Sequence, residues 1–417
     1  MVHTPASLLS HCGRRLLIVA VAACLLATPA ARAAGTVAGR YLPDVDYGRG
    51  SLVVGSDGNV YRALDAAKGK DPVAAKDATW QLAHAAFDMT LDVPGRFDSI
   101  EKAFAFIAGA TISDTATVTV QLAPGTYQLT RSLVVGHSNG QRVTLKGGKD
   151  PGKYVVKNGD GNAIVVSSGL DIAMEGFVID GNDSTANGVM IENHSSTVLR
   201  NLVIKDFRMG VSVGRGSHLE AEDVKITSKR GNAGVHAFAG SDCVLRTCSA
   251  TLQANPRSTE ITFGFAAWFS STMECDDCTS TGWHDGFFCG NAGSLDLRRC
   301  SAIMNRVGAS TYLDSSLRAV ECTFEGNKTY GMNLHDGTAS VVSCRFIDNR
   351  DIAIRSYGAS MVDFRGRPCE ISGSPVGVQS IASGVFVGVK PTIRGDGRLS
   401  DIYKYEMPDD AVFQFDK

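Results

Sequence analysis

The fold is decided between residues 286 and 352, which read GFFCGNAGSLDLRRCSAIMNRV (286–307), GASTYLDSSLRAVECTFEGNKTY (308–330) and GMNLHDGTASVVSCRFIDNRDI (331–352). Each segment starts on glycine, and its first and third following positions are apolar or small. Alternation with a period of two indicates a short β-strand, and a repeat of 22 or 23 residues indicates stacked coils. The sequence therefore predicts a β-solenoid.

The same restart recurs from about residue 187 onward. Its positions are Gly188, Gly210, Gly234, Gly264, Gly286, Gly308, Gly331, Ala353 and Gly377. Two further columns keep this register, namely Cys248, Cys278, Cys300, Cys322 and Cys344, and then Asn305, Asn327 and Asn349. Equivalent residues of successive coils stack about 4.8 Å apart, so we expect a buried cysteine column and a hydrogen-bonded asparagine ladder. Eight extra residues between the first two cysteines predict an inserted loop around Asn255 to Glu260.

The segment before the repeat predicts a cap for the solenoid. Asp98 and Glu101 resemble a capping box for an amphipathic helix over residues 100–107, and a strand at 118–122 follows. Helix, strand and the turn at 123–127 resemble the opening of phage tail spikes and secreted polysaccharide lyases in the pectin-lyase-like superfamily. The resemblance covers roughly residues 92 to 400. It implies a right-handed parallel β-helix with an N-terminal capping helix. Together with the repeat and the segment before residue 88, it predicts an all-β chain with about ten coils and a small N-terminal β module.

The first 33 residues predict an export signal. Arg14 and Arg15 precede an apolar run over residues 16–27, and Ala31-Arg32-Ala33 is a small-x-small cleavage site. A lipoprotein box ending at Cys24 is the alternative reading of the same segment. Both readings place the mature protein outside the cytoplasm, secreted or periplasmic, and no later segment is apolar enough to span a membrane.

Residues 35–88 predict a small separate module ahead of the β-helix domain at 92–417. Gly58-Asn59-Val60-Tyr61 and Trp80 resemble the short chitin-binding modules of secreted glycosidases. Such modules stack exposed aromatic rings on sugars, but Leu64 and Asp65 stand where an exposed tryptophan is usual. Tyr61 and Trp80 are therefore expected to form a miniature core.

Charge and cysteine spacing exclude several classes of function. A formal net charge of −2 gives no broad attraction to nucleic acid or anionic lipid. Cys275, Cys278, Cys289 and Cys300 number four, but Cys289 falls on a different strand of its coil, so they should not converge on zinc. Asp276-Asp277 lacks the companion signatures of polygalacturonase-type hydrolases. We expect no metal and no cofactor.

The repeat places the second and fourth residues after each restart on the outside of one strand. These positions carry His236, Phe238, Trp268, Phe288, Asn333 and Tyr357, which we expect to contact a substrate. Exposed aromatic rings on stacked strands suit an extended glycan, unless loops pack over them.

The candidate catalytic residues lie on the same strands or where they end, and they are Tyr312, Asp314, His335, Asp336 and Arg355. Asp314 and Asp336, on neighbouring coils, would serve a hydrolase, while His335 or Tyr312 as base with Arg355 on a uronate carboxylate would serve a lyase. His284-Asp285 is the second candidate pair.

The predicted function is glycan engagement along this outer face, with cleavage by a polysaccharide lyase or a glycoside hydrolase. The alternative is a non-catalytic extracellular structural or adhesion protein. The expected partner is a polysaccharide, and the sequence leaves monomer and homotrimer both open.

Overall fold

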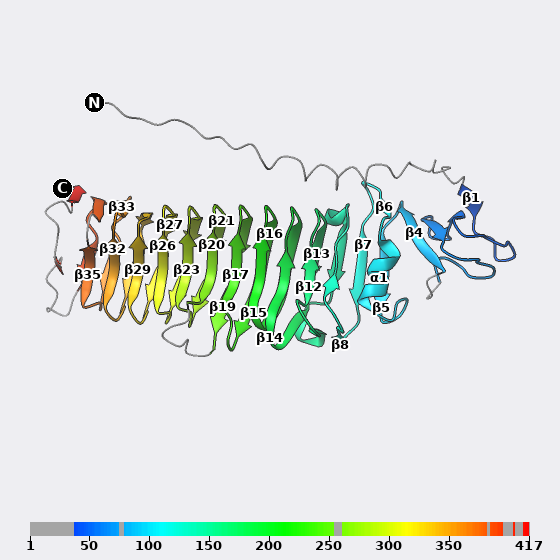
Figure 1. Ribbon diagram of the computed structural model, residues 1–417, viewed down its shortest axis with the longest axis horizontal. Helices are drawn as coiled ribbons and strands as arrows, with labels where there is room; N and C mark the ends of the chain where they lie inside the picture. The colour runs from blue at the N-terminus through cyan, green and yellow to red at the C-terminus, as the bar shows by residue number, and fades with distance from the viewer. Residues whose placement is uncertain are drawn as a thin grey trace, which may run out of the picture.

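A computed structural model describes residues 37–74, 79–253, 261–381, 384–394, 403–404 and 412–416, and it shows a long solenoid behind a small N-terminal sheet (Figure 1). The predicted export signal, the Cys24 alternative and the predicted insert around residues 255–260 lie outside the described residues. Within the solenoid each coil adds strands to parallel sheets, which we name A, B and C in chain order. The right-handed parallel β-helix is confirmed.

Sheet A begins each coil. Its strands are β5 (Met89–Val93), β7 (Val118–Leu122), β10 (Val143–Lys146), β13 (Asp171–Glu175), the first parts of β15 (Ser196–Gly214) and β16 (His218–Ser228), β18 (Asp242–Arg246), β21 (Thr272–Asp276), β24 (Ser294–Arg298), β27 (Ser316–Val320), β30 (Thr338–Val342), β33 (Met361–Arg365), β36 (Val385–Val389) and β39 (Val412–Asp416).

Sheet B follows after a corner. Its strands are β8 (Gly125–Gln128), β11 (Tyr154–Lys157), the first part of β14 (Val178–Ile191), the middle of β15, the second part of β16, β19 (Ser249–Leu252), β22 (Thr279–Thr281), β25 (Ser301–Ile303), β28 (Thr323–Glu325), β31 (Arg345–Ile347), β34 (Glu370–Ser372) and β37 (Thr392–Arg394).

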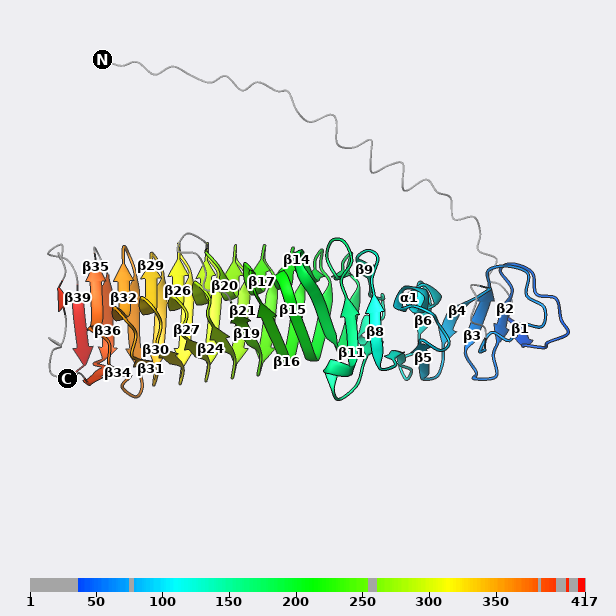
Figure 2. The same ribbon diagram turned by 90° about the horizontal axis from the view of Figure 1, so that it is seen from below.

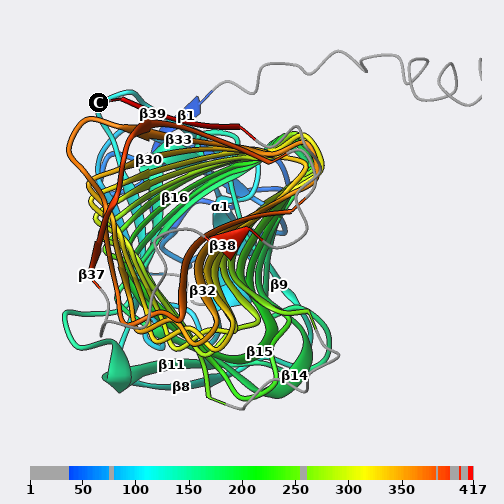
Figure 3. The ribbon, with the colours of Figure 1, turned by 90° about the vertical axis from the view of Figure 1, so that its left-hand side faces the viewer.

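Sheet C closes each coil and contains the predicted outer strand. Its strands are β9 (Leu133–Val134), β12 (Ile164–Val166), the last parts of β14 and β15, β17 (Ala233–Phe238), β20 (Phe263–Trp268), β23 (Asp285–Gly290), β26 (Val307–Tyr312), β29 (Tyr330–His335), β32 (Ile352–Tyr357), β35 (Val376–Ile381) and β38 (Tyr403–Lys404). The described residues thus place twelve strands in sheet C, about two coils more than the repeat predicted. The additional coils, at β9 and β12, do not restart on glycine. Seen down the axis, the coils superpose (Figure 3), and seen from the side they form a long rod (Figure 2).

The cysteine column is confirmed inside the solenoid. Cys248, Cys278, Cys300, Cys322 and Cys344 are all buried, and all nine cysteines of the described residues are free thiols. The column has a sixth member, because the Cys344 backbone N–H donates to Cys369 Sγ at 3.4 Å. Each thiol therefore acts as a small core side chain at the corner between sheets A and B.

The asparagine ladder is also confirmed, at the corner between sheets B and C. The Asn305 N–H donates to Asn327 Oδ1 at 3.1 Å, and the Asn327 N–H donates to Asn349 Oδ1 at 3.2 Å. All three side chains are fully buried, and Trp283 caps the ladder by donating its backbone N–H to Asn305 Oδ1 at 3.0 Å. Glycine is required beside the ladder, because a Cβ on Gly308 would lie 2.9 Å from Asn327 Nδ2.

The small N-terminal sheet contains β1 (Val37–Arg40), β2 (Leu52–Val54), β3 (Val60–Ala63), β4 (Trp80–Ala85) and β6 (Thr111–Ile112). Tyr61 and Trp80 are at most 1% exposed, so they form a miniature core as expected and cannot stack on a sugar. β6 comes from beyond residue 88 and pairs with β4, so this sheet extends past the predicted boundary of the module.

The capping helix α1 spans Ile100–Ile107, and short 3-10 helices follow at η1 (Gly140–Arg142) and η2 (Pro151–Lys153). Ser99, not Asp98, is the N-cap of α1, since Ser99 Oγ accepts the Lys102 N–H. Asp98 instead pairs with the Lys102 side chain, one turn into the helix. The predicted helix is therefore present, with its cap one residue later than the sequence indicated.

Candidate functional site

The outer face of sheet C has three columns of side chains, one more than the repeat predicted. Val307 pairs with Tyr330 and Ala309 with Met332, while the intervening glycines Gly308 and Gly331 are left out of the register. This irregularity turns the residue before each glycine to the same face as the second and fourth residues after it. The contact of Phe263 with Phe288, whose ring centroids are 4.7 Å apart, shows the additional column. Sequence reasoning missed it because strict alternation was assumed through the glycine.

Aromatic rings in the N-terminal half of this face pack on one another. Trp268 stacks on Phe288 with ring centroids 4.6 Å apart, and both rings cover Gly290, whose missing side chain makes the room. Phe288 is only 7% exposed, so the structure corrects its assignment as a substrate contact. The rings of His236 and Phe238 stack in the same way, 5.4 Å apart.

The C-terminal half carries what we call the tyrosine–histidine cluster, made of Tyr312, His335 and Tyr357 on three successive coils. Direct pairing of Tyr312 with His335 and of His335 with Tyr357 confirms the predicted register. The imidazole lies edge-on between the two phenol rings, with centroid distances of 5.0 and 4.8 Å. Tyr312 is 37% exposed and Tyr357 40%, so this cluster faces solvent.

Arg355 lies beside the cluster and is held by aromatic rings. Its Nη1 donates to the Tyr330 hydroxyl at 3.1 Å, and its guanidinium lies 5.1 Å from the Tyr330 ring and 5.7 Å from the Tyr357 ring. Arg355 Nε and the neighbouring Asn333 Oδ1 have no hydrogen-bond partner within the described part of the chain. The guanidinium is thus fixed in place without being neutralised by a carboxylate there.

Asp336 and Asp314 lie at the corner after sheet C, where both residues have positive φ angles of 50° and 54°. Asp336 Oδ2 lies 3.2 Å from His335 Nε2, and Asp336 Oδ1 accepts the Ala359 N–H at 2.9 Å. A backbone hydrogen bond of 2.7 Å joins Asp314 to Asp336, but the described contacts include none between their carboxylates. Asp336 therefore orients His335, while Asp314 serves the turn.

His284 and Asp285 form a closed network where β23 begins. His284 Nδ1 lies 2.6 Å from Asp285 Oδ2, and Arg306 Nη1 lies 2.9 Å from His284 Nε2. Asp285 is buried and also accepts the Ser310 hydroxyl at 2.7 Å. Both imidazole nitrogens are occupied, so this pair has no nitrogen left for a substrate proton.

The partly buried side chain of His236 should make the stability of the protein depend on pH. Burial lowers its pKa to about 4, below the value of about 6.5 in an unfolded chain. The unfolded state therefore binds more protons between these two values, and stability falls as the pH falls through that window. We expect the wild type to lose about 1–2 kcal/mol between pH 7 and pH 5, and His236→Gln to lose less. Urea unfolding of the wild type and of His236→Gln at both pH values measures this difference, and an equal loss of stability in both proteins would contradict it.

The described residues contain neither a membrane-spanning helix nor a cluster of metal ligands. None of the helices there is long and apolar enough to cross a membrane. No group of three or more His, Cys, Asp or Glu side chains within the described ranges is arranged to hold a metal ion.

Comparison with known proteins gives a family match over the repeat. The family model described as a right handed beta helix region matches residues 187–346 and 270–390. A curated relative, the SHC SH2 domain-binding protein 1 of Mus musculus, is 29% identical over 128 residues, which are 30% of this chain. The chain spans only 18% of the length of that relative.

Solved structures with similar coils include three of different kinds. The periplasmic alginate epimerase AlgG is 13% identical with a TM-score of 0.43, over 73% of this chain and 83% of that one. ORF18 of Geobacillus virus E2 is 14% identical with a TM-score of 0.47, over 84% and 72%. Pectate lyase Pel9A is 12% identical with a TM-score of 0.42, over 75% and 78%. Identities this low say nothing about a shared activity.

Proposed function

We propose that this right-handed parallel β-helix binds an acidic polysaccharide along sheet C and cleaves it by β-elimination. The single observation that carries this proposal is the tyrosine–histidine cluster with Arg355 fixed beside it. A proton acceptor, two phenols and a guanidinium without a described carboxylate partner are the groups that this reaction needs.

Each residue has a distinct role in the proposed reaction. With its Nε2 proton directed at Asp336, His335 presents Nδ1 as the base that removes the proton from C5 of a uronate. Arg355 binds the uronate carboxylate and stabilises the negative charge that develops when that C–H bond breaks. As the C4–C5 double bond forms, the bond from C4 to the glycosidic oxygen breaks, and Tyr312 or Tyr357 gives that oxygen a proton.

A hydrolase is less well supported by this geometry. Hydrolysis needs two carboxyl groups facing one glycosidic bond. Asp336 is engaged by His335 and the Ala359 N–H, and Asp314 occupies a tight corner. This arrangement favours the lyase over the hydrolase.

The proposal includes the location of the protein. The charged, apolar and small-residue segments of the first 33 residues support export from the cytoplasm, where a polysaccharide of this kind would be met.

The test is to incubate the protein with uronate-containing and neutral polysaccharides. The expected result is new ultraviolet absorbance from an unsaturated uronate product, with the uronate polymers alone. New reducing ends without that absorbance would replace the lyase by a hydrolase. Binding without either product would favour a non-catalytic binding protein, for which the exposed rings of Tyr312 and Tyr357 supply a surface.

A further inference from the structure

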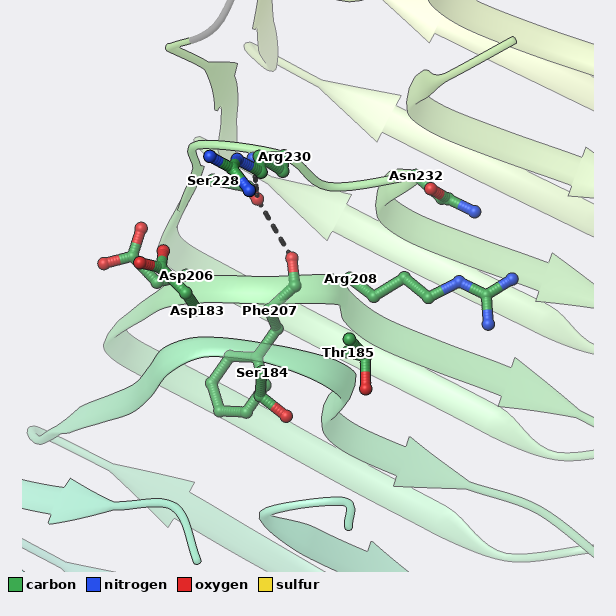
Figure 4. A pocket seen from close by; sticks show the side chains of 9 residues that line it. All are labelled: Asp183, Ser184, Thr185, Asp206, Phe207, Arg208, Ser228, Arg230 and Asn232. Atoms are coloured by element: carbon green, nitrogen blue, oxygen red, sulfur yellow. Dashed lines mark hydrogen bonds between the residues drawn. The ribbon is translucent and has the colours of Figure 1, made fainter. Parts of the chain in front are cut away.

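A pocket of about 290 Å³ lies at the corner between sheets B and C, far along the chain from the tyrosine–histidine cluster (Figure 4). Its walls come from β14, β15 and the turn after β16. The residues that matter for its chemistry are Asp183, Thr185, Asp206, Arg208, Arg230 and Asn232.

The pocket exists because the asparagine ladder does not reach these coils. Phe207 stands three residues before Gly210, as Asn305 stands three before Gly308. The pairing of β14 with β15 shifts register between Asp180 and Ser184 and again before Asn187, which opens the corner. The Ser228 hydroxyl donates to the Phe207 carbonyl at 2.9 Å and holds the coils together (Figure 4).

The two aspartates of the pocket share one cation. Lys229 Nζ lies 3.5 Å from Asp183 Oδ1 and 3.4 Å from Asp206 Oδ2. The neighbouring carboxylates, Asp206 first, raise the pKa of Lys229, so Lys229 stays protonated and pairs with both aspartates. One net negative charge remains at this end of the pocket.

The two arginines are not engaged in that network. Arg208 and Arg230 are exposed and form no ion pair with the described residues. Figure 4 shows Arg208 extended away from Asp183 and Asp206, on the side where Thr185 and Asn232 lie. A guanidinium presents paired N–H donors that match the two oxygens of a carboxylate.

We propose that this pocket is a second glycan site, which binds a sugar acid through its carboxylate. Arg208 holds the carboxylate on the side where Thr185 and Asn232 can hydrogen-bond the sugar hydroxyls, and Arg230 adds a second positive charge from the opposite side of the pocket, beside Ser228 (Figure 4). The choice of a uronate rests on the proposed function, whereas the anion site rests on the pocket alone. The pocket lies on the coils of β14 to β16, at the edge where the strands of sheet C begin, whereas the tyrosine–histidine cluster lies on β26, β29 and β32, at the edge where they end, so the two are separate sites.

The experiment titrates the full chain with D-glucuronate at low salt, with D-glucose and sulfate as comparison ligands, and every form carries Arg355→Gln so that the uronate contact of the proposed active site does not contribute. The double variant Arg208→Gln/Arg230→Gln should bind glucuronate at least tenfold more weakly than the form with Arg355→Gln alone. Arg246→Gln, which removes an exposed arginine from sheet A, should bind it normally. D-glucose should bind far more weakly to every form, because it lacks the carboxylate.

Several results would overturn this site. They are unchanged glucuronate binding in the double variant, an equal loss in Arg246→Gln, or binding of sulfate without binding of glucuronate. The variant His335→Gln separates the two proposals, since it should bind glucuronate in the pocket normally. If the protein lacked lyase activity but still bound glucuronate through Arg208 and Arg230, the proposed reaction would be wrong and the pocket proposal would remain.

Discussion

Replacing His335 with glutamine is expected to lower the rate of unsaturated-uronate formation by about 10²- to 10⁴-fold, the usual contribution of a positioned base. Glutamine keeps the approximate size and polarity of the side chain but cannot accept the proton. His335 is partly exposed between two tyrosine rings, so its replacement should leave the coils intact. The measurement is the steady-state rate on a uronate polymer, with kcat and KM determined separately.

His218→Gln is the matched control for this experiment. His218 also faces a carboxylate, Asp242, at 2.9 Å, but it lies on sheet A instead of sheet C. It should retain the full rate. If His335→Gln were as active as the wild type, the tyrosine–histidine cluster would lose its assigned role. Loss of activity in His284→Gln alone would indicate that the reaction takes place at the start of the sheet C strands, beside His284 and Asp285.

Replacing Asn327 with leucine is expected to destabilise the solenoid by about 3–5 kcal/mol, because several buried groups lose their partners together. Asn327 Oδ1 accepts the Asn305 N–H, and Asn327 Nδ2 donates to the Ala302 carbonyl at 3.2 Å and to Asn349 Oδ1 at 2.8 Å. Leucine is similar in size and offers none of these bonds. In a stack of coils the damage should be local, since each coil contacts mainly its neighbours.

Denaturant unfolding and hydrogen exchange together measure this effect. Exchange should become faster mainly between residues 286 and 352, and slow exchange should persist in the coils near residue 200. Arg350→Leu is the control, because Arg350 is exposed at the corresponding corner of the next coil. It should change stability by no more than about 0.5 kcal/mol. Equal stability of Asn327→Leu and the wild type would show that the ladder contributes little.

The fold could be predicted in detail because the same pattern of residue types recurs at equivalent positions of successive coils. Fixed offsets such as those of Cys300, Cys322 and Cys344 require equivalent environments, and a line of stacked corners provides them. Prediction was weaker where the repeat is irregular. The coils at β9 and β12 lack the glycine restart, and the cap of α1 depends on a single hydroxyl of Ser99.

The candidate site was predicted only in part, because side-chain packing is not periodic. The predicted register placed Tyr312, His335 and Tyr357 next to one another. It did not predict the contact of Arg355 with Tyr330, which precedes the glycine of its coil. It also suggested that Phe288 is exposed, whereas Trp268 covers it. The pocket at Arg208 and Arg230 had no sequence signal, since it forms where a ladder residue is missing.

The column of buried cysteines allows the unfolding of this protein to be followed coil by coil. Six consecutive coils carry a buried thiol at the same corner, at Cys248, Cys278, Cys300, Cys322, Cys344 and Cys369, and the coils of Cys248 and Cys278 also hold the buried thiols of Cys243, Cys275 and Cys289. A thiol-specific reagent cannot reach any of them until its own coil separates from the next. Labelling during slow unfolding, read out by mass spectrometry, would therefore record the order in which these coils detach, with at least one natural reporter in each.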